Sequence, residues 1–240
     1  MAAVPWLDGE RARAANRHRR MRQQLKTLAS STSSDSLAAS FRRRRFVLFQ
    51  DLVASVNHCP VTILDLGGWQ EFWEVMGFTD APHKIILLNL YQITVRHPNF
   101  TSIVGDARNL DTFADQSVDV VFSNSVIEHV GTYADQQRMA NEVRRVGRKY
   151  FIQTPSFFFP FEPHFLFPVF HWLPFSLRLL LIRRFSLGYI ARKQSREEAL
   201  RTLAEFRLLK KSEMKVLFPD ASIHSERVLG FTKSYIAVRH

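Results

Sequence analysis

The chain has a single cysteine, no signal-peptide pattern and no uninterrupted apolar span. Because Cys59 has no second cysteine to pair with, an internal disulfide and a cysteine-based zinc cluster are excluded, which is consistent with a reducing compartment. The first residues are basic and polar, so no signal peptide is expected. Four prolines interrupt the most apolar region, whose candidate helix, 173–185, is shorter than the roughly 20 residues of a membrane span. These absences predict a cytoplasmic protein.

Two catalytic signatures are also missing. A hydrolase of the nucleophile-elbow type needs Gly-x-Ser-x-Gly, which the sequence lacks. The turn Gly67-Gly68-Trp69-Gln70 is not Gly-x-Gly-x-x-Gly, and no carboxylate ends the next apolar run. A dinucleotide-dependent oxidoreductase is therefore disfavoured.

Four apolar runs stop abruptly at small or polar residues. They are 63–68, 84–90, 103–107 and 118–130. A buried parallel strand has this pattern when it delivers a ligand-binding loop at its carboxyl end. Four such strand ends predict a nucleotide-type site along the edge of a doubly wound sheet.

The ends of these runs resemble the class I S-adenosylmethionine-dependent methyltransferases, in the group called type 11. The first run ends in an acidic residue and a glycine turn, Asp65-Leu66-Gly67-Gly68, and the second ends at Asn89, the position that binds ribose in the family. The third supplies Gly105-Asp106-Ala107, which in the family lies at the adenine. The fourth enters a helix through Glu128-His129.

The resemblance implies a cofactor, S-adenosylmethionine, and a set of residues that bind it. The predicted set is Asp65, Gly67, Gly68, Trp69, Asn89, Leu90, Asp106, Ala107 and Asn124. Two positions depart from the family pattern, because the later glycines of its turn are replaced here and Asn89 stands where a carboxylate is usual. An amide still hydrogen-bonds ribose hydroxyls, but without charge assistance.

The predicted catalytic residues are His129, Glu128, His164 and Glu162. Methyl transfer is an in-line displacement that needs positioning and, for many acceptors, a base that removes a proton. His129 is either such a base or a residue that packs or caps its helix, and Glu162 and His164 either act in chemistry or fasten the apolar segment around them. Ser125 occupies the position of a metal-binding glutamate in related O-methyltransferases, so no metal site is expected.

The fold class that follows is α/β. We expect a Rossmann-like doubly wound sheet, mostly parallel, with 150–155 as its fifth strand. Segments 222–229 and 233–238 have strand patterns and predict a C-terminal antiparallel pair, as the resemblance also implies. A Phe- and Pro-rich helical lid is inserted at 156–195, within a methyltransferase domain that spans 36–240.

The N-terminal segment carries most of the net charge. Residues 1–45 contain 11 Lys and Arg against three carboxylates, which gives +8 of the total of +11. Residues 1–35 are predicted to be a flexible basic extension, which is either simply solvated or an arm for an anionic partner. From Phe41 to Val53, apolar residues at helical spacing predict a helix that packs one face on the sheet, and an arginine of 42–45 is a candidate to reach the cofactor's carboxylate.

The lid segment is unusually aromatic. Residues 156–190 hold nine of the 21 phenylalanines and one carboxylate, Glu162. Loops that leave the carboxyl ends of strands form the substrate pocket in such folds, which predicts an apolar acceptor. The helix expected at 173–185 carries Arg178, Arg183 and Arg184, a pattern that also suits peripheral contact with an anionic membrane. The alternative is a helical pair that completes the core or forms a dimer interface.

The sequence thus predicts a methyltransferase that acts on a hydroxyl or carboxyl oxygen of an apolar or lipid-linked small molecule. The alternative is a non-catalytic binding or scaffold protein on a degenerate methyltransferase fold, which contacts nucleic acid or an anionic membrane. The turn after the fourth run, Ser123-Asn124-Ser125-Val126, lacks the Pro-Pro-aromatic pattern of base methyltransferases. Nucleic acid is therefore not the expected substrate.

Overall fold

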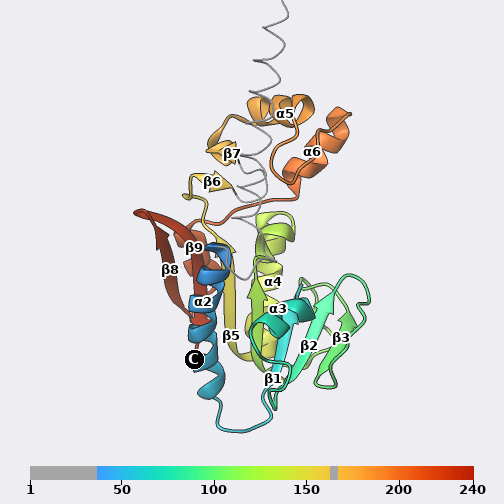
Figure 1. The fold of residues 1–240 in the computed structure, drawn as a ribbon, viewed down its shortest axis with the longest axis vertical. Helices are drawn as coiled ribbons and strands as arrows, with labels where there is room; N and C mark the ends of the chain where they lie inside the picture. The colour runs from blue at the N-terminus through green and yellow to red at the C-terminus, as the bar shows by residue number, and fades with distance from the viewer. Residues whose placement is uncertain (1–36, 163–166) are drawn as a thin grey trace, which may run out of the picture.

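A seven-stranded sheet forms the centre of the protein (Figure 1). The computed structural model describes residues 37–162 and 167–240. The strands lie in the order β3-β2-β1-β4-β5-β9-β8. Their bounds are β1 Thr62–Leu66, β2 Lys84–Asn89, β3 Phe100–Val104, β4 Val118–Asn124, β5 Gly147–Pro155, β8 Ser222–Val228 and β9 Phe231–Arg239.

The first five strands are parallel, and the last two form an antiparallel pair in which only β9 runs against the others. Ile63 of β1 lies opposite Ile85 of β2 and Val120 of β4, so the most apolar strands occupy the middle of the sheet. β9 is antiparallel to β5, with Phe151 opposite Val238, and β8 is antiparallel to β9. The predicted α/β class, with its closing antiparallel pair, is therefore confirmed.

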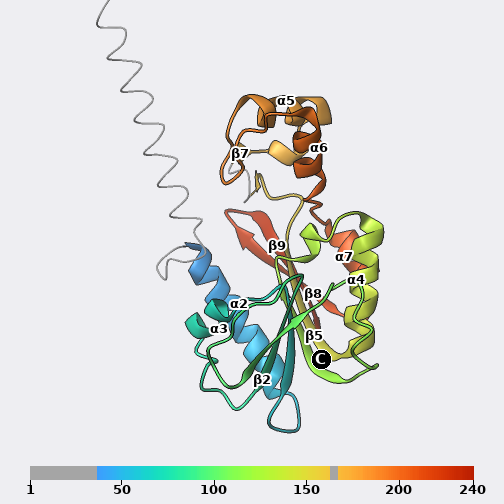
Figure 2. The same ribbon diagram turned by 90° about the vertical axis from the view of Figure 1, so that its right-hand side faces the viewer.

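Helices cover both faces of the sheet (Figure 2). On one face lie α2 (Leu37–Ala54) and α3 (Gln70–Val75), and on the other lie α4 (Tyr133–Val146) and α7 (Lys211–Leu217). Because alternate residues of a strand point to opposite faces, each strand supplies both layers of the core. Thus Phe122 packs on the α2 side, whereas Val121 packs on the α4 side.

The α2 layer is built mostly from aromatic rings. Phe46 and Phe49 of α2 are buried, together with Leu52 and Val53, which confirms the helix predicted from the spacing of these residues. The Phe49 ring lies 4.8 Å from Phe122 and 5.8 Å from Phe151, both measured between ring centroids. Aromatic pairs at such distances add to the stabilisation from buried area. The side chain of Phe41 lies outside the described residues.

The segment after β5 forms a separate unit above the carboxyl ends of the strands (Figure 1). It contains the hairpin β6 (Phe161–Glu162) and β7 (Phe167–Pro168), the 3₁₀ turn η2 (Phe170–Trp172), α5 (Phe175–Arg184) and α6 (Arg196–Ala204). A small apolar cluster holds it together, made of Phe170, Ile182, Leu187, Ala199 and Leu203. Since α6 supplies two members of this cluster, the lid includes α6 and extends beyond the boundary at 195 that the sequence suggested.

The two ends of the lid lie side by side. Ser156 forms a parallel bridge with Leu209, and the Phe157 N–H donates to the Leu209 carbonyl at 3.0 Å.

Within 37–162 and 167–240, no helix combines the length and apolarity needed to cross a membrane. The basic extension at 1–35 lies outside the described residues, so its predicted role stays a prediction.

Removal of the Phe49 ring should destabilise the whole domain. Its side chain is fully buried among the rings of three elements, so Phe49→Ala should lower the free energy of unfolding by about 3 to 5 kcal/mol, measured by urea denaturation. Val47, on the same helix, is 56% exposed, and Val47→Ala should change it by no more than about 0.5 kcal/mol. Similar losses in both variants would contradict this account of the core.

Candidate functional site

A cavity of about 270 Å³ lies at the carboxyl edge of the sheet. It is bordered by the ends of β1, β2 and β3 and by the segment that follows β4, which includes the 3₁₀ turn η1 (Ile127–His129). Its lining residues are Gly67, Leu88, Asn89, Leu90, Tyr91, Gly105, Asp106, Ala107, Arg108, Val126, His129 and Val130. The structure therefore brings together six predicted site residues, namely Gly67, Asn89, Leu90, Asp106, Ala107 and His129.

Both glycines of the turn after β1 are required by close packing. Gly67 has a φ of +69°, and a Cβ there would lie 2.8 Å from a methyl carbon of Val126. A Cβ on Gly68 would lie 1.7 Å from Oδ2 of Asp65. Any side chain at Gly68 would therefore displace the Asp65 carboxylate.

Asp65 is buried beneath this turn and does not line the cavity. Its Oδ2 accepts a hydrogen bond of 2.7 Å from Nε1 of Trp73, which joins β1 to α3. Burial raises the pKa of Asp65 to about 8, and the bond from Trp73 opposes this rise only in part. Asp65 thus supports the turn from below.

Asn89 connects the end of β2 to the same turn. Its Nδ2 donates a hydrogen bond of 2.8 Å to the carbonyl oxygen of Gly68, which fixes the orientation of the amide. An amide has a carbonyl oxygen and a second N–H besides the one used here. These two groups of Asn89 are available to hydrogen-bond the ribose hydroxyls.

Arg108 is a cavity residue that the sequence reasoning missed. Its guanidinium binds the Asp106 carboxylate, with Nη2 2.5 Å from Oδ2 and Nε 3.0 Å from Oδ1. These bonds lower the pKa of Asp106. Arg108 also reaches Asp135 at the start of α4, at 3.4 Å. The available signal was a cation two residues after the predicted adenine-binding carboxylate.

His129 lines the cavity, whereas its neighbour Glu128 does not. Glu128 is fully buried, and its Oε2 accepts a hydrogen bond of 3.0 Å from Oγ1 of Thr154. Nε2 of His129 lies 4.0 Å from Oε1 of Glu128. The imidazole also packs edge-on against Phe206, at 5.1 Å between centroids. His129 thus has a carboxylate neighbour and an aromatic support.

Asn124 does not line this cavity. Asn124 and Phe122 lie two residues apart on β4, so they share the face that α2 covers. Oδ1 of Asn124 accepts a hydrogen bond of 2.8 Å from Nη1 of Arg45. Nε of Arg45 also lies 3.2 Å from a carboxylate oxygen of Glu226, so Arg45 contacts both side chains, and the predicted reach of an arginine of 42–45 to the cofactor stays a prediction.

The remaining predicted residues lie around the cavity or outside the described part. Trp69 is 48% exposed, and its ring lies 6.0 Å from Tyr91, which lines the cavity. Glu162 belongs to β6, but its side chain is not among those described, and His164 lies outside the described residues. Within the described ranges, no three His, Cys, Asp or Glu side chains are grouped to hold a metal.

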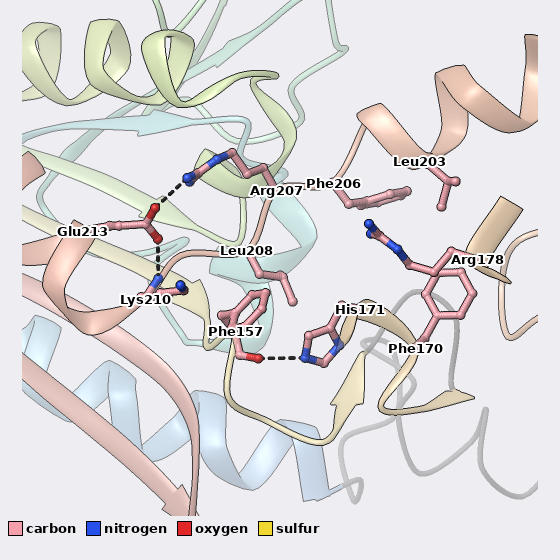
Figure 3. Close-up of a pocket in the computed structure, with 10 residues that line it drawn as sticks. All are labelled: Phe157, Phe170, His171, Arg178, Leu203, Phe206, Arg207, Leu208, Lys210 and Glu213. Carbon is pink, nitrogen blue, oxygen red and sulfur yellow. Dashed lines mark hydrogen bonds and ion pairs between the residues drawn. The ribbon is translucent and has the colours of Figure 1, made fainter. Parts of the chain in front are cut away.

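A second cavity, of about 330 Å³, lies between the lid and the sheet domain (Figure 3). Its lining residues are Phe157, Phe170, His171, Arg178, Leu203, Phe206, Arg207, Leu208, Lys210 and Glu213. Phe206 lines this cavity and contacts His129, which lines the first one. The two rings therefore form part of the wall between the cavities.

Residues 70–150 match the family model described as a methyltransferase domain. This part of the chain, from α3 into β5, therefore matches a methyltransferase domain. The match extends from the first residue of α3 into β5, so it includes the strand ends that carry Asn89, Asp106 and His129. The predicted family and cofactor are thereby confirmed.

Individual relatives are more distant from this methyltransferase domain. An uncharacterized protein of Mycobacterium tuberculosis, Rv1509, is 31% identical over 70 residues, which cover 29% of this chain and 24% of that protein. A structure described as a possible exported protein from Bordetella parapertussis has a TM-score of 0.51 at 12% identity, and covers 83% of this chain and 68% of its own. This likeness shows the fold alone. An S-adenosylmethionine-dependent methyltransferase from Aquifex aeolicus matches with a TM-score of 0.47 at 12% identity, over 91% of this chain and 98% of its own.

The buried Asp65 carboxyl of the methyltransferase domain should make stability depend on pH. Its pKa is raised from 3.8 to about 8 on folding, so between these values the folded protein keeps a proton that the unfolded chain loses. The stabilisation is complete below pH 3.8 and is lost as the pH rises through about 8. The free energy of unfolding of the unmodified protein, relative to Asp65→Asn, should therefore fall as the pH rises from 4 to 8.

Urea denaturation at a series of pH values measures this difference. Asp111→Asn, at an exposed aspartate, controls for the loss of a surface charge. A difference between the unmodified protein and Asp65→Asn that does not vary with pH would show that burial does not shift this carboxyl.

Proposed function

We propose that this chain catalyses methyl transfer from S-adenosylmethionine to an oxygen atom of an apolar small molecule. The observation that carries the proposal is the cavity at the sheet edge, where four strand ends bring Gly67, Asn89, Asp106 and His129 together. The second cavity supports an apolar acceptor, because it adjoins the first and half of its lining is apolar, namely Phe157, Phe170, Leu203, Phe206 and Leu208.

The cofactor's adenosine would be held by Asp106 and Asn89. The Asp106 carboxylate is the acceptor for the adenine amino group, and it remains ion-paired with Arg108 while doing so, because a carboxylate accepts several hydrogen bonds. Asn89 would bind the ribose hydroxyls with the part of its amide that Gly68 does not use. Gly67 lines the same cavity with its backbone, and the remainder of the cofactor would lie beside it.

His129 would accept the proton that the acceptor loses. When bound, S-adenosylmethionine supplies an electrophilic methyl group. The imidazole lies in the cavity wall towards the lid, against Phe206, where an acceptor in the second cavity would approach it. Glu128, 4.0 Å from Nε2, would stabilise the imidazolium that forms. Its burial and its bond from Thr154 keep this carboxylate in place.

A second candidate function is non-catalytic binding on the same fold, with nucleic acid or an anionic membrane as partner. The observation that favours it is the extent to which the predicted cofactor ligands already have partners. Asp106 is held by Arg108, Asn89 by Gly68, and Asn124 by Arg45. A cofactor that could not share these groups would bind weakly or not at all.

Titration with S-adenosylhomocysteine separates the two functions. The unmodified protein should bind it, measured by isothermal titration calorimetry. Asp106→Ala should weaken binding by about 1 to 3 kcal/mol, because the adenine amino group would lose its acceptor in a partly buried site. Asp111→Ala, an exposed aspartate close by, and His129→Ala should leave the affinity nearly unchanged.

Failure of the unmodified protein to bind S-adenosylhomocysteine would favour the non-catalytic function. Binding that is unchanged in Asp106→Ala would keep methyl transfer as the function but overturn the assignment of the adenine site.

We also propose that the outer face of α5 contacts anionic membranes, which would suit a lipid-linked acceptor. Leu180 and Phe185 are 50% and 57% exposed, and the neighbouring Arg183 and Arg184 are exposed as well. Exposed apolar residues beside cations are typical of peripheral membrane contact.

Binding to vesicles of phosphatidylcholine and phosphatidylserine, measured by co-sedimentation, tests this contact. It should weaken as salt rises, but retain a salt-resistant part that the double variant Leu180→Ser, Phe185→Ser loses. Val47→Ser, at an exposed apolar residue of α2, is the control. Absence of binding at low salt would make a soluble acceptor the better hypothesis.

A further inference from the structure

The second cavity combines apolar walls with several cationic groups. Figure 3 shows Phe170, Leu203 and Phe206 around its lid side, with the guanidinium of Arg178 directed towards Phe206. Arg207, Lys210 and Glu213 lie on the opposite side, next to the sheet domain. The charges of this cavity therefore divide into two groups.

In the group next to the sheet domain, Arg207 and Glu213 are paired with each other. Nη2 of Arg207 lies 2.5 Å from Oε1 of Glu213, and Nη1 donates to Oε1 of Gln136 at 2.8 Å. The backbone N–H of Lys210 donates to the other carboxylate oxygen of Glu213 at 2.8 Å. Lys210 is exposed, and its ammonium lies 5.3 Å from the centre of the Phe157 ring. Arg207 and Glu213 thus hold the loop after α6 in place.

Arg178, on the lid side, is different. Among the residues that the structure describes, none makes a hydrogen bond or ion pair with its guanidinium, and its Nε is buried without an acceptor. Its guanidinium carbon lies 5.6 Å from the centre of the Phe175 ring. Burial lowers the pKa of Arg178, with no carboxylate to oppose the effect.

An arginine in this situation needs an anion. Its guanidinium stays charged at all physiological pH values, so it cannot relieve its burial by losing the proton. Arg178 is half-buried and its Nε is enclosed without an acceptor, which is unfavourable for a charged group; a carboxylate that binds in the planar, two-bond geometry that guanidinium favours would offset this cost. Arginine that serves only to cover apolar surface normally places its charged end in water. The end of Arg178 instead faces a cavity (Figure 3).

We infer that the second cavity is the acceptor pocket and that it selects an apolar carboxylic acid, whose carboxylate binds the guanidinium of Arg178 while its apolar part lies against Phe170, Leu203 and Phe206. This inference rests on the proposed function and names the acceptor class for it. A single carboxylate matches the one guanidinium on the lid side. The contact between Phe206 and His129 lies on the side of the pocket next to the cofactor cavity, so the end of the acid that reaches this contact would carry the hydroxyl that is methylated and whose proton His129 accepts.

Two matched compounds test the inference on the full chain. 1-Naphthaleneacetate is an aromatic acid, and 2-(1-naphthyl)ethanol has the same ring system with a neutral hydroxyl. Isothermal titration calorimetry should show that Arg178→Gln weakens binding of the acid about tenfold or more, because a charged hydrogen-bond partner is lost. Binding of the alcohol should change less than about twofold, since it depends on apolar contact.

Two further variants control for general charge effects and for folding. Arg184→Gln removes an exposed arginine of the same helix and should leave binding of the acid unchanged. Arg178→Lys keeps the charge and should restore part of the affinity. Because the alcohol needs the folded cavity, its unchanged binding shows that Arg178→Gln is folded. Equal loss of acid binding in Arg178→Gln and Arg184→Gln, or no acid binding by the unmodified protein, would overturn the inference.

Titration with S-adenosylhomocysteine in parallel separates this inference from the proposed function. If S-adenosylhomocysteine binds but the acid is insensitive to Arg178→Gln, methyl transfer stands and the acceptor class is wrong. If the acid depends on Arg178 but S-adenosylhomocysteine does not bind, the pocket for the acid is supported, whereas its role as an acceptor pocket is overturned.

Discussion

The hydrogen bond between Trp73 and Asp65 is the interaction on which the site depends most. It ties the end of β1 to α3 and places the Asp65 carboxyl directly under Gly68. The Gly68 carbonyl in turn receives the Asn89 amide, so β2 is fixed to the same turn. One buried polar pair therefore sets the relative positions of three elements at the edge of the cavity. The pair includes a carboxyl whose ionised form is unfavourable because the group is buried.

The sequence predicted the sheet well because the central parallel strands β1, β2 and β4 are buried along most of their length and are therefore largely apolar runs. It predicted the cavity through the residues that end those runs, Gly67, Asn89, Asp106 and His129, since carboxyl ends of parallel strands meet at one edge. Asn124 lies on the face of β4 that α2 covers, where it binds Arg45, because a strand alternates its side chains between faces; its role at the cofactor stays a prediction. The roles proposed for all these residues stay predictions until ligand binding is measured.

Other features could not be predicted because they depend on contacts between distant segments. Arg108 follows Asp106 closely, but its position also depends on Asp135, which belongs to α4. The second cavity is lined by residues from the segment after β5, from the lid helices and from the loop after α6. Gln136 joins that loop to the first cavity, since its buried Nε2 donates to the carbonyl oxygens of Ile127 and Arg207 at 3.0 and 2.8 Å. No local pattern indicates such a bridge between residues 71 positions apart.

The lid leaves and re-enters the sheet domain at one point, where Ser156 pairs with Leu209. A segment whose ends already meet can change in length or sequence without altering the path of the chain on either side. The lid also has its own apolar cluster, so changes within it need not disturb the packing around β4 and β5. Evolution or protein engineering could therefore exchange this segment as a unit, giving the same catalytic sheet a different choice of substrate.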